Sequence, residues 1–432
     1  MKVDLLIHNC GQLLTLASAG PKIGPALRDV GLVPHGAIAI REGRIVLVGS
    51  EAEVRQQASA QVEIDAQGRV VMPGFVDPHN HLVFAGDRVE EFEQRLGGAS
   101  YQEIAARGGG ILSSVRATRA ASFQDLVAQS RARLDRMLAQ GTTTAEAKTG
   151  YGLSLPDELR LLQAIVELGR SHPIDLVPTF LGAHAIPPEY VAQAEEYVDL
   201  VVEEMLPAVR DRRRELNATP FCDVFCDEGA FNAAQARRIL SAAQRLGLGI
   251  KIHAEEFART GGARVAAELG ATSADHLIQT DSGDWAALAA VGVMAVLLPG
   301  TPFGLGLSKY APAREMIAAG VSIALGTDLN PGTCYCESMP TIIALASRTM
   351  RLAPAEAISA ATLNAAHAIG RAHEVGSLEV GKRADVLVLD SDDYRDLAYR
   401  FGGNLVARVI KDGREVASNS VVLAAKVRPG AH

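Results

Sequence analysis

The central part of the chain alternates short apolar segments with stretches that have helical periodicity, and this alternation limits the possible folds more than any other feature. Eight apolar segments are typical of buried strands: 74–79, 142–148, 176–181, 222–226, 249–253, 273–276, 293–298 and 322–327. Connections between parallel strands cross over in a right-handed sense, so the connecting helices pack on the outside of the sheet. The alternation therefore predicts an α/β protein with a closed (β/α)8 barrel of the TIM type.

Two of the intervening stretches carry clear helix signals. Residues 122–140 place Leu126, Val127, Leu134 and Leu138 on one face. Residues 232–246 begin with Asn232, a residue favoured at helix N-caps, and Gln235 follows three positions later. That spacing is typical of a capping box, in which the two side chains and backbone N–H groups bond reciprocally. Both stretches are expected to be outer helices of the barrel.

The two ends of the chain have a different rhythm. Residues 1–70 and 371–432 contain short segments with period-two alternation separated by turn formers, such as 37–41 and 406–411. The Gly- and Pro-rich segment 18–35 is expected to be a loop. We predict a small composite β-sandwich domain built from 1–70 and 371–432, and a catalytic barrel over 71–370. One barrel of about 250–300 residues plus a smaller unit fits the 432-residue length.

Composition excludes several classes of protein. The 42 basic and 50 acidic side chains give a net charge of −8, which argues against a nucleic-acid partner. Asp4 and His8 interrupt the apolar N-terminal segment, which therefore lacks the core of a signal peptide. No stretch approaches the ~18 apolar residues of a membrane span. We expect a cytoplasmic protein without membrane partners.

The five cysteines are expected to be reduced thiols. Their number is odd, and the chain carries no export signal. Cys222 and Cys226 are separated by three residues and Cys334 and Cys336 by one, whereas structural zinc knuckles use a two-residue spacing.

Polar residues collect where the predicted strands end. The first strand runs into His79 and His81, the fifth ends at His253, the sixth at His276, and the eighth precedes Asp328. Alternate residues of an extended segment point the same way, so His79 and His81 can bind one metal ion. The carboxyl ends of all barrel strands share one rim, where barrel enzymes have their active sites. His79, His81, His253 and Asp328 should therefore converge, although each alone could be a hydrogen-bonded buried residue.

This order of His-x-His, His, His and Asp resembles the amidohydrolase superfamily. Binuclear members of that superfamily carry a carboxylated lysine at the end of strand four, where this chain has Cys226, Asp227 and Glu228. Lys148 lies at the end of strand two instead. The resemblance thus implies one divalent metal per chain, Zn²⁺ or Fe, held by His79, His81, His253 and Asp328.

Longer motifs are similar to those of the imidazolonepropionase family within this superfamily. They cover nearly the whole chain and occupy residues 77–88, 107–110, 148–152, 180–184, 253–256 and 328–333. The resemblance implies that Arg88, Tyr151 and His184 bind the substrate, with Tyr101 assisting Arg88. It also implies that Glu256 lies over the attacking water and contacts the substrate. Residues implied to contact the ring-opened product are Tyr151, Asn330, Gly332 and Thr333.

The reaction implied is hydrolysis of 4-imidazolone-5-propanoate to N-formimidoyl-L-glutamate in histidine degradation. Water activated by the metal would attack the ring carbonyl carbon. Asp328 would take its proton, Glu256 would relay a proton to the leaving nitrogen, and His276 would hydrogen-bond the oxyanion. The partner is a small molecule with a carboxylate arm, and a homodimer is expected.

Two other functions remain open from the sequence. A mononuclear aminohydrolase acting on a nucleobase or a guanidine-like compound would share the metal ligands, and so would a non-enzymatic scaffold on this fold. Structural roles are also open for single residues. Glu255 and Glu256 could open a helix, where acidic residues are favoured anyway, His184 could cap a turn, and Arg88 could be a solvated surface charge. The glycines 108–110 form either a mobile flap or a turn.

Overall fold

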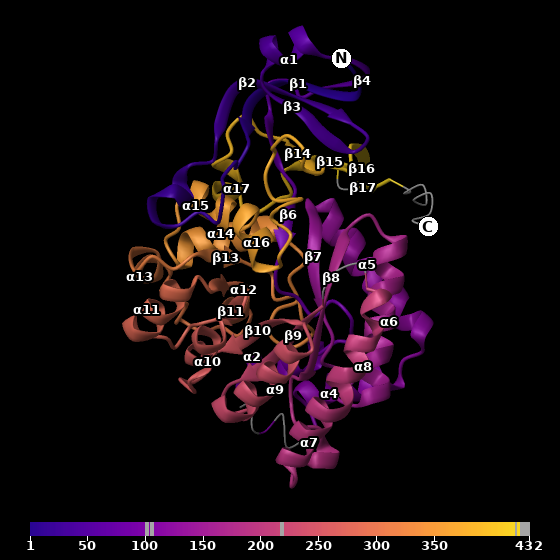
Figure 1. Cartoon of the computed structure of the whole chain (residues 1–432), viewed down its shortest axis with the longest axis vertical. Helices are drawn as coiled ribbons and strands as arrows, with labels where there is room; N and C mark the ends of the chain where they lie inside the picture. Colours follow the sequence, from indigo (N-terminus) through magenta and orange to yellow (C-terminus); the bar gives the residue numbers. More distant parts are fainter. Residues whose placement is uncertain (100–102, 104–107, 217–219, 420, 424–432) are drawn as a thin grey trace.

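The chain forms two sheets, one parallel and one mixed. The computed structural model describes residues 1–99, 103, 108–216, 220–419 and 421–423. An eight-stranded parallel sheet follows the order β13-β12-β11-β10-β9-β8-β7-β6, and a nine-stranded mixed sheet combines strands from both ends of the chain. In Figure 1 the mixed sheet lies at the top of the molecule and the parallel sheet with its helices lies below it.

The parallel strands form the predicted barrel. Their bounds are β6 (Phe75–Asp77), β7 (Thr142–Lys148), β8 (Asp175–Ala183), β9 (Phe221–Cys226), β10 (Gly249–Ala254), β11 (Ser273–His276), β12 (Met294–Leu297) and β13 (Ile323–Leu325). Two backbone hydrogen bonds link the segments that follow the first and last strands. The N–H of Asp328 donates to the carbonyl of His79 (2.9 Å), and the N–H of His81 donates to that of Leu329 (2.8 Å). The (β/α)8 prediction is confirmed, and its seam lies at the predicted metal ligands.

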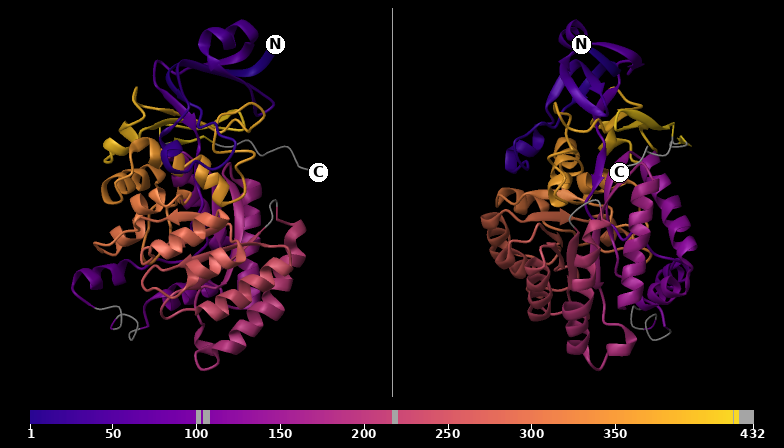
Figure 2. Two further views of the ribbon diagram at one scale, coloured as in Figure 1. Left: turned by 60° about the vertical axis from the view of Figure 1, so that its left-hand side comes forward. Right: turned by 45° about the vertical axis from the view of Figure 1, so that its right-hand side comes forward.

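Helices accompany the barrel strands, and most of them cover its outside (Figures 1 and 2). They are α2 (Val89–Leu96), α4 (Ile111–Ala120), α5 (Phe123–Ala139), α6 (Leu155–Ser171), α7 (Ala194–Leu200), α8 (Leu206–Asp211), α9 (Ala233–Arg245), α10 (Gly262–Leu269), α11 (Ser282–Val291), α12 (Gly300–Gly304), α13 (Ala313–Ala318), α14 (Met339–Thr349), α15 (Pro354–Ala360) and α16 (Leu363–Ala368). Asn232 caps α9 in the predicted capping box with Gln235. Across the described residues, no helix has the length and apolar character needed to cross a membrane.

The mixed sheet joins the two ends of the chain. Its elements are β1 (Lys2–Leu14), β2 (Leu32–Arg41), β3 (Arg44–Ser50), β4 (Ser59–Asp65), β5 (Val70–Pro73), β14 (Val386–Leu389), β15 (Val406–Lys411), β16 (Arg414–Ser418) and β17 (Val421–Val422), with helices α1 (Glu51–Gln57) and α17 (Asp396–Tyr399). Strand β5 pairs with both β1 and β14 and so connects the two halves. The predicted loop 18–35 is interrupted, because it holds a short 3₁₀ helix, Gly24–Arg28, and the start of β2. The domain boundaries at 70 and 371 stay a proposal.

The mixed sheet sits at the amino-terminal end of the barrel strands. Strand β5 leads directly into β6, and the N–H of Gly74 between them donates to the carbonyl of Asp385 (3.0 Å). The ammonium group of Lys411 on β15 contacts Asp175 at the start of β8 (2.6 Å) and Asp385 (2.5 Å). The carboxyl ends of the barrel strands therefore face away from the mixed sheet (Figure 1).

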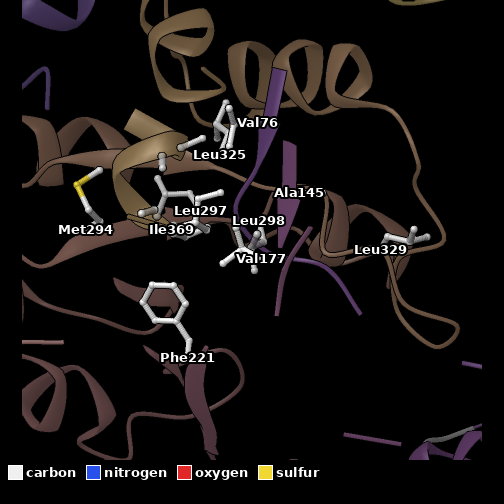
Figure 3. Packing of buried hydrophobic residues seen from close by; sticks show 14 of the residues in the cluster. Val76, Ala145, Val177, Phe221, Met294, Leu297, Leu298, Leu325, Leu329 and Ile369 are labelled. Carbon is white, nitrogen blue, oxygen red and sulfur yellow. The ribbon is translucent and has the colours of Figure 1, made fainter. Parts of the chain in front are cut away.

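The apolar core of the barrel unit is continuous from strand to strand. Val76, Ala145, Val177, Leu297 and Leu325 come from five different strands and are all buried (Figure 3). A fully buried valine or leucine side chain contributes roughly 1.5–3 kcal/mol, so the outward faces of the strands hold the helices in place. The five cysteines are free thiols, as expected.

Candidate active site

The structure brings the four predicted metal ligands together at the carboxyl ends of the strands. His79 and His81 follow β6, His253 lies on β10, and Asp328 follows β13. The Nε2 atoms of His253 and His81 are 3.3 Å apart. Asp328 Oδ1 lies 3.4 Å from His79 Nε2 and 3.5 Å from His81 Nε2. All four side chains are buried, so these atoms face one another rather than solvent.

The chemistry of this cluster fits a divalent metal. Among the described residues, His79 Nε2 and Asp328 Oδ1 are buried without a hydrogen-bond partner. Such orphaned polar atoms are costly unless something binds them. The ligand atoms of His79, His81 and Asp328 lie within 4.8 Å of one another, and those of His79, His253 and His276 do the same. Imidazole nitrogens with one carboxylate form a donor set suited to Zn²⁺ or Fe.

Asp328 is held in an unusual backbone conformation. Its φ is +52°, and His276 and Leu277 have φ values of +72° and +58°. Non-glycine residues in the left-handed region store strain and collect at functional sites. Thr301 donates a hydrogen bond to Asp328 Oδ2, which leaves Oδ1 directed at the histidines. Burial raises the pKa of Asp328 to about 6.

Glu256 and His276 face each other beside this cluster. Glu256 Oε2 lies 3.5 Å from His276 Nε2. Burial, with a smaller contribution from Asp328, raises the pKa of Glu256 well above its usual range. Burial lowers the pKa of His276 well below its usual range. The pair therefore favours a neutral carboxylic acid next to a neutral imidazole, and each can donate one hydrogen bond.

The loop that carries Glu256 is not the start of a helix, contrary to the structural alternative raised from the sequence. Helix α10 begins only at Gly262, and Glu255 adopts a positive φ of +51° in a bend. The carboxylate of Asp227, just after β9, accepts the backbone N–H groups of Glu256 (2.6 Å) and of the next two residues (both 3.0 Å). Asp227 thus fixes the bend that presents Glu256, a role that the sequence analysis missed.

His184 and Tyr151 lie against the histidine cluster. The rings of His184 and His81 stack with centroids 4.9 Å apart, and Tyr151 meets His184 edge-on at 5.3 Å. His184 Nδ1 lies 3.0 Å from the carbonyl oxygen of Gly150 and must donate to it, because a carbonyl only accepts. Burial lowers the pKa of His184 to about 3, so the ring is neutral. His184 therefore belongs to the same cluster and does more than cap a turn.

Arg88 is largely buried rather than a solvated surface charge. Its side chain is 11% exposed, and its Nε donates to Glu91 Oε2 (2.7 Å). Glu91 Oε1 in turn accepts the N–H of Gly110 (3.1 Å). A Cβ at Gly332 would come within 2.0 Å of Arg88 Nη1, so any other residue there would displace the guanidinium from this position. Arg88 is therefore held between α2, the glycine segment 108–110 and the loop after β13.

The loop after β13 is shaped by Asn330. Its Oδ1 accepts the N–H groups of Gly332 (2.9 Å) and Thr333 (2.8 Å), and its Nδ2 donates to the carbonyl of Asp328 (2.8 Å). These bonds link the predicted product contacts to Asp328. Tyr101 lies outside the described residues. Gly110 is the N-cap of α4, and whether the glycine segment is a mobile flap or a turn stays open.

Comparison with known proteins identifies the family. The pattern of the "Amidohydrolase family" matches residues 70–416. A protein of Symbiobacterium thermophilum named imidazolonepropionase is 54% identical over 97% of this chain and 99% of its own length. One of the same name from Chloroflexus aggregans is 54% identical over 96% and 99%. The chain belongs to the amidohydrolase family, in its imidazolonepropionase branch.

Solved structures share the fold at much lower identity. A zinc-containing adenosine deaminase from Xanthomonas campestris superposes with a TM-score of 0.73 at 19% identity, over 98% of this chain and 95% of its own. Guanine deaminase of E. coli gives 0.68 at 16% identity, over 96% and 99%. At this distance the likeness concerns the amidohydrolase fold alone.

Beneath the predicted ligand histidines of this amidohydrolase lies a charged layer that was not expected from the sequence. It consists of Glu146, Lys148, Asp223, Lys251 and Asp275, all fully buried. The ammonium group of Lys148 contacts Asp223 (2.6 Å) and Glu146 (2.9 Å), so it is already engaged. One signal was available, since charged residues recur at period two in strands that are otherwise apolar, as at 146 and 148.

Proposed function

We propose that this chain is an imidazolonepropionase, which hydrolyses 4-imidazolone-5-propanoate to N-formimidoyl-L-glutamate in histidine degradation. The observation that carries the proposal is near-full-length identity of 54% to relatives of that name, combined with a histidine–aspartate cluster that suits a metal. The reaction adds water to the ring carbonyl carbon, breaks its bond to the ring nitrogen and gives that nitrogen a proton.

His79, His81, His253 and Asp328 would hold one Zn²⁺ or Fe ion per chain. When bound, such a metal lowers the pKa of a coordinated water from 15.7 towards ~7 and stabilises negative charge on a carbonyl oxygen. The buried, partnerless atoms His79 Nε2 and Asp328 Oδ1 support this assignment. Chelation should abolish activity and one equivalent of metal should restore it, whereas a fully active metal-free protein would contradict it.

The acid–base roles follow from protonation states. Asp328, with a pKa raised to about 6, can accept the proton of the attacking water near neutral pH. Glu256, whose pKa burial raises well above the usual range, can orient that water and deliver a proton to the leaving nitrogen. A neutral His276 can donate a hydrogen bond to the developing oxyanion.

The remaining residues would bind the organic part of the substrate. The guanidinium of Arg88 can receive the propionate carboxylate through two parallel N–H donors, supported by Tyr151 and Tyr101. His184 would contact the imidazolone ring. The loop formed by Asn330, Gly332 and Thr333 would contact the ring-opened product.

The direct test follows the ultraviolet absorbance of 4-imidazolone-5-propanoate during incubation with purified, metal-loaded protein. Loss of absorbance without release of ammonia supports the proposal. Ammonia release from a nucleobase or a guanidine-like compound, with the imidazolone left intact, would favour the aminohydrolase alternative instead. An inert but metal-loaded protein would indicate the scaffold alternative.

The cytoplasmic location and the homodimer also remain predictions. Light scattering of the purified protein measures the oligomeric state, and a monomeric mass would contradict the second of them.

A further inference from the structure

The interior of the barrel beneath the ligand histidines is ionic rather than apolar. Glu146 and Lys148 lie on β7, Asp223 on β9, Lys251 on β10 and Asp275 on β11, each fully buried. Besides its contacts with Asp223 and Glu146, the ammonium group of Lys148 lies 3.9 Å from Asp275. That of Lys251 lies 3.0 Å from Glu146 and 3.6 Å from Asp275. Four strands are therefore connected by one network of three carboxylates and two ammonium groups.

Two of the three carboxylates contact ligand histidines. Asp275 Oδ2 lies 2.5 Å from Nδ1 of His79, and Asp223 Oδ2 lies 3.0 Å from Nδ1 of His253. An ionised carboxylate only accepts hydrogen bonds, so Nδ1 of His79, which is hydrogen-bonded to Asp275, carries the proton. Among the described residues Nδ1 of His253 has no hydrogen-bond partner, but the negative charge of Asp223 beside it favours the proton on the same nitrogen. The lone pair is then on Nε2. In both rings Nε2 points towards the shared centre, since it is the atom nearest to Asp328 in His79 and to His81 in His253.

The third carboxylate has different contacts. Glu146 forms ion pairs with Lys148 and Lys251 and accepts a hydrogen bond from Thr179 (2.5 Å). Like the other two carboxylates, Glu146 is fully buried and belongs to the same network with the two lysines. A substitution of Glu146 therefore removes a charge from the network without removing a contact with a histidine.

A gain in folding stability does not explain a buried ionic network of this kind. Removing charged groups from water is expensive, and apolar side chains of similar volume often fill an interior equally well. The residues next to these charged side chains along the strands, such as Ala145, Val224, Ile252 and Ala274, are apolar and point to the opposite face, so the ionic layer belongs to the interior below the histidines.

We propose that Asp275 and Asp223 are positioning residues that set the metal affinity by fixing the orientation and tautomer of His79 and His253, while Lys148 and Lys251 hold the two carboxylates in place. This inference rests on the metal site proposed above. Carboxylates that accept the far N–H of a ligand histidine typically change metal affinity 10–100-fold when they are removed.

The experiment measures the Zn²⁺ dissociation constant of metal-free protein by competition with a chromophoric chelator. We expect Asp275→Asn and Asp223→Asn each to weaken Zn²⁺ binding about 10–100-fold. The matched control, Glu146→Gln, removes the same charge from the same layer and should bind Zn²⁺ close to wild type. Wild-type affinity in both aspartate variants, or an equal loss in Glu146→Gln, would overturn the inference.

Folding is checked on the metal-free variants by circular dichroism and thermal unfolding. Each aspartate variant retains two carboxylates for the two ammonium groups, so neither lysine is left buried without a carboxylate in the layer. Asp223→Asn acts on a different histidine and strand from Asp275→Asn, so either variant alone decides the question if the other does not fold. An inactive wild type that still shows the affinity pattern would refute the proposed reaction but not this inference. An active wild type whose variants lack the affinity pattern would support the proposed reaction and refute this inference.

Discussion

At the scale of single residues, burial raises the pKa of two acids at the site to different extents. Asp328 has its pKa raised to about 6, while burial and the nearby Asp328 raise that of Glu256 well above its usual range. Two carboxyl groups whose protonation differs near neutral pH can divide the base and acid steps between them. The assignment of roles to these residues can be tested one side chain at a time.

For the proton relay, we expect Glu256→Gln to retain the metal but lower kcat about 10²–10⁴-fold, because the amide keeps the shape of the acid but cannot transfer its proton. Steady-state kinetics and metal analysis of the same preparation measure both quantities. A near-normal kcat would move the relay to Asp328 alone.

For substrate recognition, we expect Arg88→Ala to lose at least roughly tenfold in kcat/KM, since breaking a desolvated charge pair costs about 2–5 kcal/mol. Lysine should restore only part of the activity, because it lacks the two parallel donors of the guanidinium. A substrate analogue with an amide in place of the carboxylate provides the control. Wild type should reject it strongly and Arg88→Ala only weakly, and equal discrimination by both would remove Arg88 from the site.

At the scale of elements, short segments at strand and helix ends are held by side chains from elsewhere in the chain. Asp227 after β9 fixes the bend after β10, and Glu255 accepts the N–H groups of Gly261 (2.7 Å) and Ala263 (2.8 Å) at the start of α10. The adjacent Glu255 and Glu256 thus have separate roles: Glu256 lies at the site, and Glu255 binds the start of α10.

We therefore expect Asp227→Ala to lower kcat on the order of 10²-fold while leaving Zn²⁺ content unchanged, because a small displacement of Glu256 is enough to disturb proton transfer. Glu255→Gln should mainly lower the melting temperature. Kinetics, metal analysis and thermal unfolding of both variants distinguish the two roles. A normal kcat for Asp227→Ala would show that the bend does not depend on its carboxylate.

The junction between α6 and β8 predicts a pH dependence of stability. His172 Nδ1 accepts the N–H of Ile174 (3.1 Å), Nε2 lies 3.2 Å from Asp135, and burial lowers the pKa of His172 to about 4. In the unfolded chain His172 is protonated below about pH 6.5, whereas in the folded chain it is protonated only near pH 4. Stability should therefore fall as the pH decreases through this window, by at most about 1.4 kcal/mol per pH unit.

Urea unfolding between pH 4 and pH 7 measures this slope. His172→Asn should flatten it relative to wild type, whereas substitution of the exposed His373 by Gln should leave it unchanged. Identical slopes in all three proteins would mean that His172 does not carry the effect.

At the scale of the whole molecule, the mixed sheet is attached to the barrel at the end opposite the site. We expect Lys411→Met to destabilise the protein by about 3–5 kcal/mol, because it removes the ammonium group that contacts both the buried Asp385 and Asp175. Thermal unfolding measures the loss, and Zn²⁺ affinity should not change. Arg395→Met removes an exposed pair with Asp393 and should cost less than about 1 kcal/mol. Equal effects of the two substitutions would contradict this attachment.

The sequence by itself determined the barrel, its eight strands and the place where the site forms. Those features depend on local patterns, namely apolar runs, helix caps and polar residues at strand ends, and parallel strands bring their carboxyl ends to one rim wherever each lies in the chain. For that reason the sequence alone was enough to predict that four residues converge, namely His79, His81, His253 and Asp328.

Only the tertiary structure decided what surrounds them. Asp275 reaches His79 across 196 positions of sequence, and Arg88 fits against Gly332 because that position lacks a Cβ. Glu255 and Glu256 do not open a helix, which the sequence had left open, because the carboxylate of Asp227 accepts the N–H of Glu256 and those of the next two residues in a bend. Such contacts depend on strand register and loop packing, which place side chains together across the barrel and leave no signal in the neighbouring sequence.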